Sequence, residues 1–276
     1  VINDKIAGIP VAITYCPLSS TVAVYDRRPG EGLGARQLRF SVSGMLRNAS
    51  TVLWDLETES WWQQTSGQAL VGEMAGSTLD QIPFMLLSFE QYYNSFPYGL
   101  VMANNIDDAV PYGTTPYYKY ENIEKEKPEL AMRRLSPRLP AMQRVVAIEA
   151  MGDRIIYPVD MVKNRGVLND TPNDVYIALF YQQGVKSTLD EREIARARDV
   201  GTVNAFSSFY KNMRLTFSKS GDKFIDEQTG SFWNISGICI EGALKGGRLR
   251  LLKHSSHFAF AALSTWPESR IFGESH

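Results

Sequence analysis

The sequence contains few of the patterns that usually disclose a protein's chemistry. Its 276 residues include only two cysteines, Cys16 and Cys239, too few for a disulfide scaffold. No stretch provides the roughly 18 uncharged apolar residues that a membrane-spanning helix needs. The 29 basic and 30 acidic residues are spread along the chain and give a formal charge of −1. We therefore expect no transmembrane segment in this chain, and no nucleic-acid partner, because no basic surface is available for one.

Sequence motifs of the common enzyme classes are also missing. The chain has no Gly-x-Ser-x-Gly, no His-Glu-x-x-His, no P-loop and no dinucleotide-binding fingerprint. This argues against the commonest hydrolases, zinc proteases and nucleotide-binding enzymes. Catalysis by two paired carboxylates stays open, since 30 acidic residues offer many pairs. The sequence identifies no catalytic residue, and whether the protein is an enzyme is undecided at this stage.

What the sequence does contain is an internal repeat. Residues 1–4 (VIND) reappear as residues 167–170 (VLND), and the apolar run 11–15 (VAITY) returns at the same offset as 177–181 (IALFY). Both runs are short and apolar and follow a turn, which is typical of strands. A fused pair of related units is therefore the first hypothesis for this chain.

The most specific match lies further along each copy. Its members share residue type and order: Asp55, Thr58, Ser60 and Trp62 in the first copy, and Asp226, Thr229, Ser231 and Trp233 in the second. Each copy then continues to an apolar segment that ends in an aromatic-Pro pair, at residues 96–97 and 266–267. Proline stops a preceding helix, so we expect a short helix at the end of each copy.

These observations predict a fold class and a division of the chain. The class is α+β and mainly β, a tandem pair of diverged β-rich repeats, each closed by a short helix. Repeat 1 covers residues 1–101 and repeat 2 covers residues 143–276. Repeat 2 opens with a hairpin over residues 145–158 that repeat 1 lacks. Because repeat 1 starts directly at its VIND motif, we expect the matching hairpin upstream of Val1.

Residues 102–142 form a connecting strap between the repeats. The strap is rich in proline and carries four tyrosines, at positions 112, 117, 118 and 120. Tyrosine rings bury apolar area, so we expect residues 110–120 to be ordered and packed against a repeat or a partner. A second local prediction concerns residues 188–198, where Thr188 and Glu191 have the spacing of a capping box and predict a solvated helix.

Several stretches together resemble the DUF3179 family, whose members are uncharacterised and mainly extracytoplasmic prokaryotic proteins. The matching stretches are residues 1–4 and 8–18 (GIPVAITYCPL), 24–28 (VYDRR), 40–46 (FSVSGML), 62–72, 110–120 (VPYGTTPYYKY), 144–160 and 187–201 (STLDEREIARARDVG). The resemblance implies a location outside the cytoplasm. Asn-x-Ser/Thr triplets at Asn48, Asn169 and Asn234 are compatible with secretion. Family members commonly read Cys-Pro-Leu-Cys where this chain reads Cys-Pro-Leu-Ser from Cys16 to Ser19, so the second thiol of a two-thiol role is missing here.

The candidate metal ligands are Cys16, His254 and His257. Cys16 ends an apolar strand, where a cysteine is a buried hydrophobe, a soft metal or redox ligand, or one half of a bridge to Cys239. Cys239 lies in a strand-like apolar run and is interpreted as a core residue. His254 and His257 are three residues apart and would share one face of a helix. Together with Cys16 they could bind copper or zinc, although structural histidines are the commoner case.

Two functional hypotheses remain. The first is a non-enzymatic binding or structural protein of an extracytoplasmic assembly, with a protein partner contacted through the strap tyrosines. The alternative is a metal- or thiol-dependent protein that uses Cys16 with His254 or His257. The sequence names neither a ligand nor a cofactor.

Overall fold

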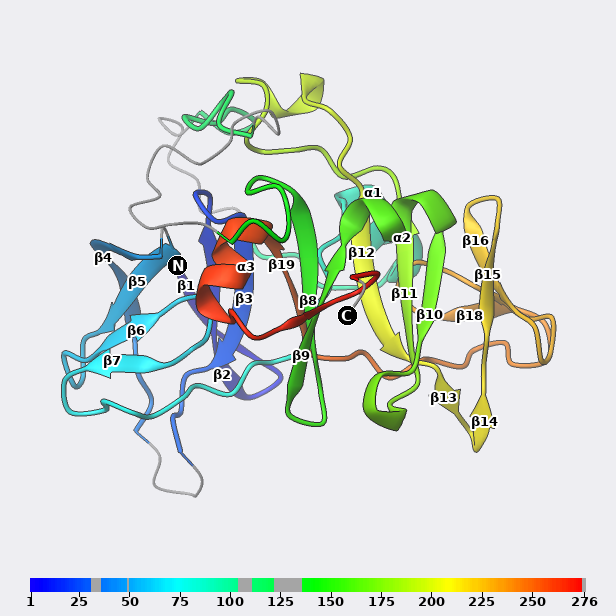
Figure 1. Cartoon of the computed structure of the whole chain (residues 1–276), viewed down its shortest axis with the longest axis horizontal. Coiled ribbons are helices and arrows are strands. Elements are labelled where there is room, and N and C mark those ends of the chain that lie inside the picture. Colours follow the sequence, from blue (N-terminus) through cyan, green and yellow to red (C-terminus); the bar gives the residue numbers. More distant parts are fainter. Residues whose placement is uncertain (31–35, 49, 104–110, 122–135, 275–276) are drawn as a thin grey trace. The chain divides into compact units, whose positions relative to one another are not determined.

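The computed structural model describes residues 1–30, 36–48, 50–103, 111–121 and 136–274, and it confirms a mainly β chain of the α+β class (Figure 1). Almost all strand pairs are antiparallel; the pairing of β20 with β9 is parallel. No helix in these residues is long and apolar enough to cross a membrane.

The described chain packs as two compact units. Unit 1 contains Val1–Phe84, Ile123–Pro158 and Lys253–His276, and unit 2 contains Met85–Asn122 and Val159–Leu252. These units cut across the division at residues 101 and 142 that the repeat suggests. Chain segments that are distant in sequence therefore share one core in each unit.

Unit 1 holds three sheets. A meander pairs β1, β2 and β3, a second sheet has the order β4-β5-β6-β7, and a third has the order β19-β8-β9-β20 with helix α3 beside it (Figure 1). The bounds are β1 Ile2–Ile6, β2 Ile9–Cys16, β3 Thr21–Asp26, β4 Phe40–Arg47, β5 Ser50–Asp55, β6 Trp61–Gln63, β7 Ala69–Val71, β8 Arg144–Ala150, β9 Asp153–Pro158, β19 His254–Phe258, α3 Ala259–Thr265 and β20 Arg270–Ile271. In β3, buried and half-buried residues alternate, as in a strand with one face in the core.

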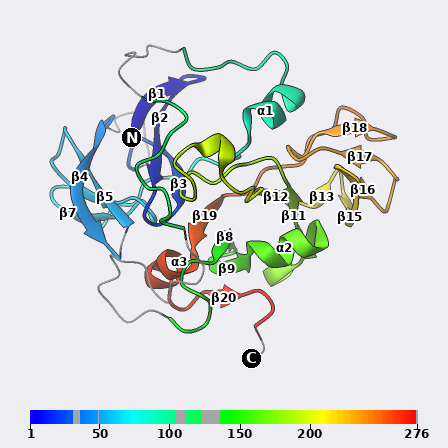
Figure 2. The same ribbon diagram turned by 90° about the horizontal axis from the view of Figure 1, so that it is seen from above.

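Unit 2 repeats the first two of these sheets. Strands β10, β11 and β12 form a meander, and β15, β16, β17 and β18 form a four-stranded sheet. Both sheets can be followed by their strand labels in Figure 2. The bounds are α1 Phe89–Ser95, α2 Val159–Arg165, β10 Val167–Asp170, β11 Ile177–Gln182, β12 Thr202–Ser207, β13 Phe209–Tyr210, β14 Met213–Arg214, β15 Phe217–Ser220, β16 Lys223–Asp226, β17 Phe232–Trp233 and β18 Cys239–Glu241, with 3-10 turns at Pro172–Asp174 and Ile194–Arg196.

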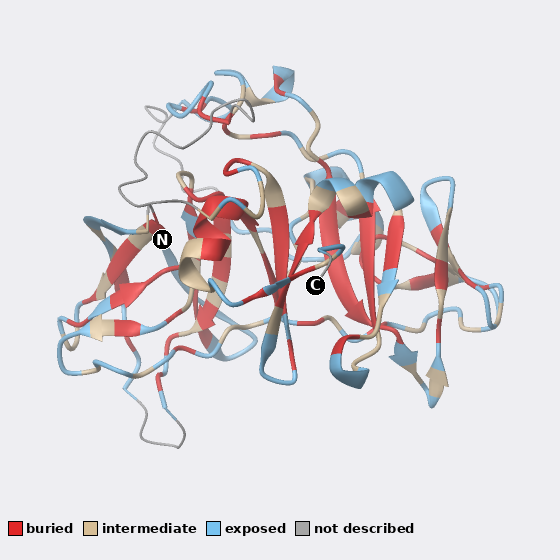
Figure 3. Ribbon diagram, in the orientation of Figure 1, coloured by how far each residue is buried: buried red, intermediate tan, exposed pale blue. Residues whose placement is uncertain are grey.

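Each unit has its own apolar core, visible as the buried central stretches of the strands in Figure 3. In unit 1 the core collects around Trp62, against which Phe40 packs edge-on. In unit 2 Phe180 stacks on Phe224 with ring centroids 4.0 Å apart, and Trp233 lies in the same cluster. Both tryptophans are completely buried.

A buried carboxylate organises the four-stranded sheet of each unit. In unit 1 the carboxylate of Asp55 accepts hydrogen bonds from Trp62 Nε1 at 2.8 Å and from the backbone N–H of Thr58 at 2.6 Å. In unit 2 Asp226 accepts the same two bonds, from Trp233 at 2.8 Å and from Thr229 at 2.6 Å. The matched residues of the two copies therefore make matched contacts.

An asparagine joins the first strand of each copy to the four-stranded sheet. The Asn3 side chain donates to the Phe40 carbonyl oxygen at 2.8 Å and accepts from the Phe40 backbone N–H at 2.9 Å. Asn169 makes the same pair of bonds with Phe217, again at 2.8 and 2.9 Å. A side-chain amide can imitate a strand's backbone in this way because it carries both a donor and an acceptor.

A seven-residue helix follows the strands of each copy, but it belongs to the other unit. Helix α1 follows the strands of repeat 1 and belongs to unit 2, whereas α3 follows those of repeat 2 and belongs to unit 1. Both helices run for seven residues and stop before an aromatic residue and a proline, Pro97 or Pro267. Helix α1 packs in unit 2 because its hydrogen-bond partners lie there: Gln91 donates to the carbonyl oxygen of Gln183, and Ser95 bonds with Ser236.

Two local predictions were wrong. Residues 188–198 form no α-helix: they contain only the 3-10 turn Ile194–Arg196, because their backbone bonds with the strap instead. The His254–Phe258 segment is a strand rather than part of a helix, because it pairs with β8 along its whole length. The helix therefore starts only at Ala259.

Part of the strap lies in the described residues, and residues 104–110 and 122–135 lie outside them. Residues 111–121 are held by backbone hydrogen bonds, from Thr115 to the Arg192 carbonyl and from Lys119 to the Asp190 carbonyl. Of the four tyrosines only Tyr120 is buried; the other three are exposed. Residues 111–121 are thus ordered through their backbone. The expected packing against a repeat is wrong for Tyr112, Tyr117 and Tyr118, and their packing against a partner stays a prediction.

We predict that Asp55→Ala and Asp226→Ala each lower the free energy of unfolding by about 2–4 kcal/mol, because each leaves a buried indole N–H and a threonine without an acceptor. Urea-induced unfolding measures the loss. Glu227→Ala, at the exposed neighbouring position, should change stability by less than ~0.5 kcal/mol. Losses below ~1 kcal/mol for both aspartates would show that the carboxylates do not organise the sheets.

Candidate functional site

Cys16 is fully buried at the end of β2, and its thiol is free. Cys239 is equally buried in β18, also as a free thiol. The alternative of a bridge between them is therefore wrong, and the expectation that Cys16 lacks a sulfur partner is confirmed. Burial raises the pKa of the Cys239 thiol, so this group is an unreactive core residue.

The two histidines do not share a face. His254 and His257 both lie in β19, and residues three apart in a strand point to opposite sides of the sheet. His254 stacks on Phe84, with ring centroids 6.1 Å apart. The predicted two-histidine arrangement required a helix, and it is lost because the segment pairs with β8.

His257 is held by two hydroxyl groups. Its Nδ1 lies 2.8 Å from Thr21 Oγ1, and its Nε2 lies 2.6 Å from Ser255 Oγ. Thr21 pairs with Cys16 across β2 and β3, so Cys16 and His257 adjoin the same residue. Binding a metal through His257 would require one of these hydrogen bonds to break. Within the described ranges, no group of three or more His, Cys, Asp or Glu side chains is placed to hold a metal ion.

The surroundings of His257 disfavour its charged form. The imidazole packs edge-on against Trp266, and the guanidinium of Arg154 lies over the Trp266 ring, 4.0 Å from its centre. Burial, with a smaller contribution from the Arg154 charge, lowers the pKa of His257 to about 3. The residue is thus a neutral core histidine at neutral pH.

Two features of unit 2 were not predicted from the sequence. The first is the α1 segment, which we define as residues 85–102. It presents apolar side chains to solvent, and Tyr98 and Leu100 are 98% and 94% exposed. Phe89, Tyr93, Val101 and Met102 are also exposed. A groove of about 410 Å³ runs between the helix and residues 100–102.

The backbone of the α1 segment is fixed although its side chains are exposed. Ser88 and Gln91 form a capping box at the start of α1. The hydroxyl of Tyr92 donates to the Leu100 carbonyl oxygen at 2.7 Å, which ties the chain after the helix back to it. Glycine is needed at position 99, since a Cβ there would collide with the Tyr92 hydroxyl.

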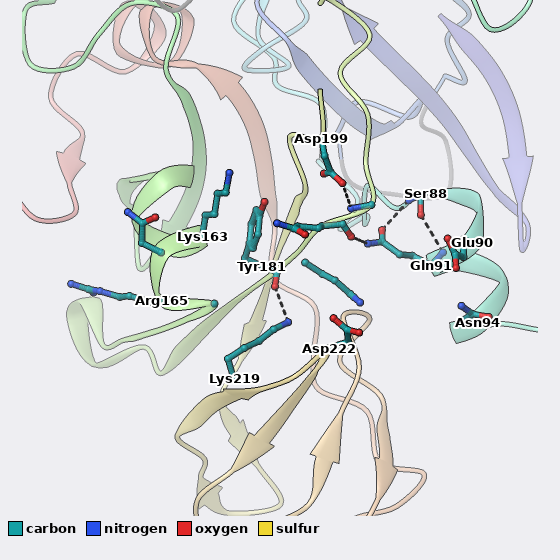
Figure 4. Close-up of a pocket in the computed structure, with 15 residues that line it drawn as sticks. Ser88, Glu90, Gln91, Asn94, Lys163, Arg165, Tyr181, Asp199, Lys219 and Asp222 are labelled. Atoms are coloured by element: carbon teal, nitrogen blue, oxygen red, sulfur yellow. Dashed lines mark hydrogen bonds between the residues drawn. The ribbon is translucent and has the colours of Figure 1, made fainter. Parts of the chain in front are cut away.

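The second feature is a polar cavity of about 770 Å³, drawn in Figure 4. Its walls come from α1, the end of α2, the end of β11 and the turn after β15. Its charged lining residues are Lys163, Arg165, Lys219, Glu90, Asp199 and Asp222. In Figure 4 Lys163 and Arg165 lie at the left, Glu90 at the right and Asp199 at the top, while Lys219 and Asp222 both lie below.

Two of these charged groups, Lys219 and Asp199, form hydrogen bonds with backbone groups. The ammonium of Lys219 donates to the Tyr181 carbonyl oxygen at 3.2 Å and lies 4.1 Å from the centre of the Phe224 ring. Burial lowers the pKa of Lys219. The Asp199 carboxylate accepts from the backbone N–H groups of Gly184 and Gly201 at 2.7 and 2.8 Å.

Tyr181 is an unusual member of the lining. Its side chain is 5% exposed, and its hydroxyl has no hydrogen-bond partner in the part of the chain that the structure describes. Burial, together with the charges of Asp199 and Asp160, raises its pKa. Tyr25 in unit 1 is equally buried, but its hydroxyl donates to the Gln64 carbonyl oxygen at 3.0 Å.

The family comparison agrees with the sequence resemblance. A family model described as a protein of unknown function, DUF3179, matches residues 1–269. The chain belongs to the DUF3179 family. No curated protein and no solved structure matched the chain. Ser19, which stands at the second-cysteine position of the Cys-Pro-Leu-Cys pattern, is fully buried with its hydroxyl 3.4 Å from that of Ser50.

We predict that stability falls in acid because of His257. The folded pKa is about 3 and the unfolded pKa about 6.5, so only the unfolded chain takes up the proton between these values. Its contribution is therefore complete above pH ~6.5 and declines by up to ~1.4 kcal/mol per pH unit below that. Urea unfolding from pH 7 to 4 measures the slope for the wild type, His257→Asn and His254→Asn.

His257→Asn should lose this part of the slope, and His254→Asn should keep it. NMR titration of the His257 ring provides a second measurement that does not depend on a variant folding. A ring that protonates with a midpoint above pH ~5.5 would contradict the prediction, because it would lie within about one unit of an ordinary histidine.

The two buried tyrosines predict opposite mutational effects. Tyr25→Phe should destabilise the protein by about 1–2 kcal/mol, because the Gln64 carbonyl oxygen loses its donor. Tyr181→Phe should be neutral or stabilising, since it removes a buried hydroxyl that has no partner among the described residues. Thermal unfolding of both variants tests this, and a Tyr181→Phe loss as large as that of Tyr25→Phe would contradict it.

Proposed function

We propose that this protein is a non-enzymatic binding protein that holds an apolar face of a partner protein on the α1 segment. The observation that carries the proposal is the exposure of apolar side chains along residues 85–102, with Tyr98 and Leu100 almost completely in solvent. A contiguous exposed apolar patch of this kind usually marks an interaction site. Aromatic residues and Met, which this segment exposes, are enriched at the core of protein interfaces.

The charge of the segment favours a protein over a membrane surface. Glu90 is the only charged residue among positions 85–102. Binding to an anionic membrane normally adds lysine and arginine around the apolar side chains, and none is present here. Binding to an apolar face of another protein requires no lysine or arginine, and charged residues are depleted at the cores of such interfaces.

The rigidity of the segment also supports binding. The capping box, the bond from Gln91 to Gln183 and the bond from Tyr92 to Leu100 hold the backbone in one arrangement. A partner would therefore not have to order this segment on binding, which removes part of the entropic cost of association. The three exposed strap tyrosines, 112, 117 and 118, add further uncovered aromatic area to unit 2.

We also propose that the protein works outside the cytoplasm as part of an assembly, as the family resemblance implies. The three glycosylation triplets no longer support this location, because their asparagines make structural hydrogen bonds. Asn169 is bonded to Phe217, Asn234 to Ser95, and Asn48 to the Ser264 carbonyl oxygen. Fractionation of the source cells tests the location, and recovery in the cytoplasm alone would contradict it.

The alternative of a metal- or thiol-dependent protein is supported less well. His254 and His257 point to opposite faces of β19, and both ring nitrogens of His257 are hydrogen-bonded. Metal analysis of the purified protein remains its direct test. Stoichiometric copper or zinc that is lost in Cys16→Ser would restore this alternative.

To test the proposal, a photo-reactive amino acid is placed at Tyr98 in the source cells, and at Met151 as the control. Met151 is also strongly exposed, at 80%, but belongs to unit 1. We expect one protein to be cross-linked from position 98 and not from position 151. Leu100→Glu should weaken its binding at least ~10-fold, since a buried charge without a partner costs more than ~1.4 kcal/mol. Met151→Glu should leave it unchanged.

Three outcomes would overturn the proposal. One is the absence of any cross-linked protein that depends on Leu100. Another is sedimentation with lipid vesicles that Leu100→Glu abolishes, which would assign the segment to a membrane surface. The third is a wild-type dimer that Leu100→Glu dissociates, which would make a second copy of the chain the occupant. Equal thermal stability of the wild type and Leu100→Glu verifies that the variant is folded.

A further inference from the structure

In unit 1 a β-hairpin fills the space between two flanking strands. Strands β8 and β9 pair with each other, β19 pairs with β8 along its whole length, and β20 pairs with β9 (Figure 1). The hairpin also covers helix α3, because its apolar residues share one buried cluster with that helix and with β20. The members of this cluster are Val145, Ile156, Ala259, Ala262, Leu263 and Ile271. The apolar side of α3 is therefore buried by the hairpin.

The two units can be aligned through their helices. Helices α1 and α3 both run for seven residues, and when their first residues are aligned, Pro97 is also aligned with Pro267. Residues 85–88 then match the last four residues of β19, and residues 100–102 match β20 and the residue after it. Unit 2 therefore contains counterparts of both strands that flank the hairpin of unit 1.

The apolar groove of unit 2 lies between these two counterparts. Residues from both segments line it, and its volume is about 410 Å³. In the described part of the chain no strand pairs with either segment. Three exposed side chains match buried cluster residues of unit 1: Phe89, Tyr93 and Val101 match Ala259, Leu263 and Ile271. The α1 segment is thus exposed at the positions that the hairpin covers in unit 1.

The backbone of β19 shows which of its residues face the hairpin. The Phe258 N–H donates to the Ser19 carbonyl oxygen at 2.8 Å, so it points away from β8. The direction of the backbone groups alternates along a strand. Ser255 and His257 therefore direct their N–H and C=O groups toward β8.

The matching backbone groups of unit 2 have no partner strand. Leu86 is turned away from the groove, because its carbonyl oxygen accepts from the Thr202 hydroxyl and neither residue lines the groove. Its neighbours Met85 and Leu87 line the groove and match the two residues of β19 that face β8. Their N–H and C=O groups form no hydrogen bond with any residue that the structure describes. Unpaired groups of this kind make an extended segment a template for another strand.

We propose that the partner protein bound at the α1 segment contributes a β-hairpin. One strand of this hairpin pairs with residues 85–88 and the other lies beside residues 100–102, as β8 and β9 lie beside β19 and β20. Such pairing supplies the backbone partners of Met85 and Leu87, which is recognition by β-augmentation. The inference rests on the proposed function, because it specifies which structure of the partner occupies that site.

The side chains of α1 restrict the sequence of the hairpin. Phe89, Tyr92 and Tyr93 stand where α3 has two alanines and a leucine. In a close-packed interface, larger side chains on one side require smaller ones on the other. We therefore expect small apolar residues, such as alanine, on the face of the hairpin that meets α1, where unit 1 has a valine and an isoleucine.

The first test maps the partner in the source cells. A photo-reactive amino acid is placed at Phe89 or at Val101, and its attachment sites on the captured protein are located by mass spectrometry. We expect the protein that is cross-linked from Tyr98 to be attached at both positions. The two attachment sites should lie no more than ~20 residues apart, on two strands joined by a turn.

The other outcomes of this mapping separate the inference from the proposed function. Attachment to a helix, or at two sites far apart in the partner's sequence, would overturn the inference and leave the proposed function intact. The absence of a captured protein would overturn both. Attachment to the hairpin expected upstream of Val1, or to a second copy of the chain, would also overturn both, because the chain itself would then fill the groove.

Hydrogen exchange of single backbone amides tests the strand pairing itself. When the purified partner is added, exchange at Met85 and Leu87 should slow at least ~10-fold, whereas exchange at Leu86 should change less than ~2-fold, because its N–H points away from the added strand. The Ser255 amide, which faces β8 in unit 1, is the matched control and should exchange slowly with and without the partner. Equal slowing at residues 85, 86 and 87 would show that an apolar face binds without strand pairing, and it would overturn the inference.

Discussion

A buried carboxylate is the interaction on which each four-stranded sheet depends. Asp55 and Asp226 are completely buried, and a charge without partners at such a place would be very costly. The cost is offset because each carboxylate accepts from an indole N–H, a backbone N–H and a threonine hydroxyl. These partners fix the tryptophan, and the apolar core of each unit collects around that ring. The serine and glycine that follow are constrained in turn, since a Cβ at Gly72 or Gly242 would collide with Ser60 or Ser231.

The last helix of each copy packs in the other unit because the chain passes from one unit to the other before that helix begins. In both copies the chain first bonds along the third strand of the meander: Ile82 N–H donates to the Val24 carbonyl oxygen, and Leu252 N–H to that of Ala205. The chain then enters the other unit, between residues 84 and 85 and again between 252 and 253. Each unit therefore takes residues from both halves of the sequence. Neither half has its complete set of packing partners by itself.

The same exchange gives the two copies different chemistry. In unit 2 the arriving segment is α1, whose polar side chains Ser88, Glu90 and Asn94 line the charged cavity and whose apolar side chains face solvent. In unit 1 the arriving segment is β19 with α3, whose apolar residues are buried and whose His257 is neutral and bonded to hydroxyl groups. The polar side chain His257 of the segment that enters unit 1 is therefore buried, whereas the polar side chains of the segment that enters unit 2 line an open cavity.

The sequence by itself determined the family, the mainly β class and the matched residues of the two copies. It did so because an aspartate, a threonine, a serine and a tryptophan at fixed spacing form a local hydrogen-bonded unit that needs no distant partner. Only the tertiary structure decided the packing of the helices, the strand at His254–Phe258 and the loss of the helix predicted at 188–198. In each case a distant segment supplied the backbone partner, β8 for the strand and the strap for residues 189–193. The cavity could not be predicted from the sequence for the same reason, since its charged residues come from four separate segments that only folding brings together.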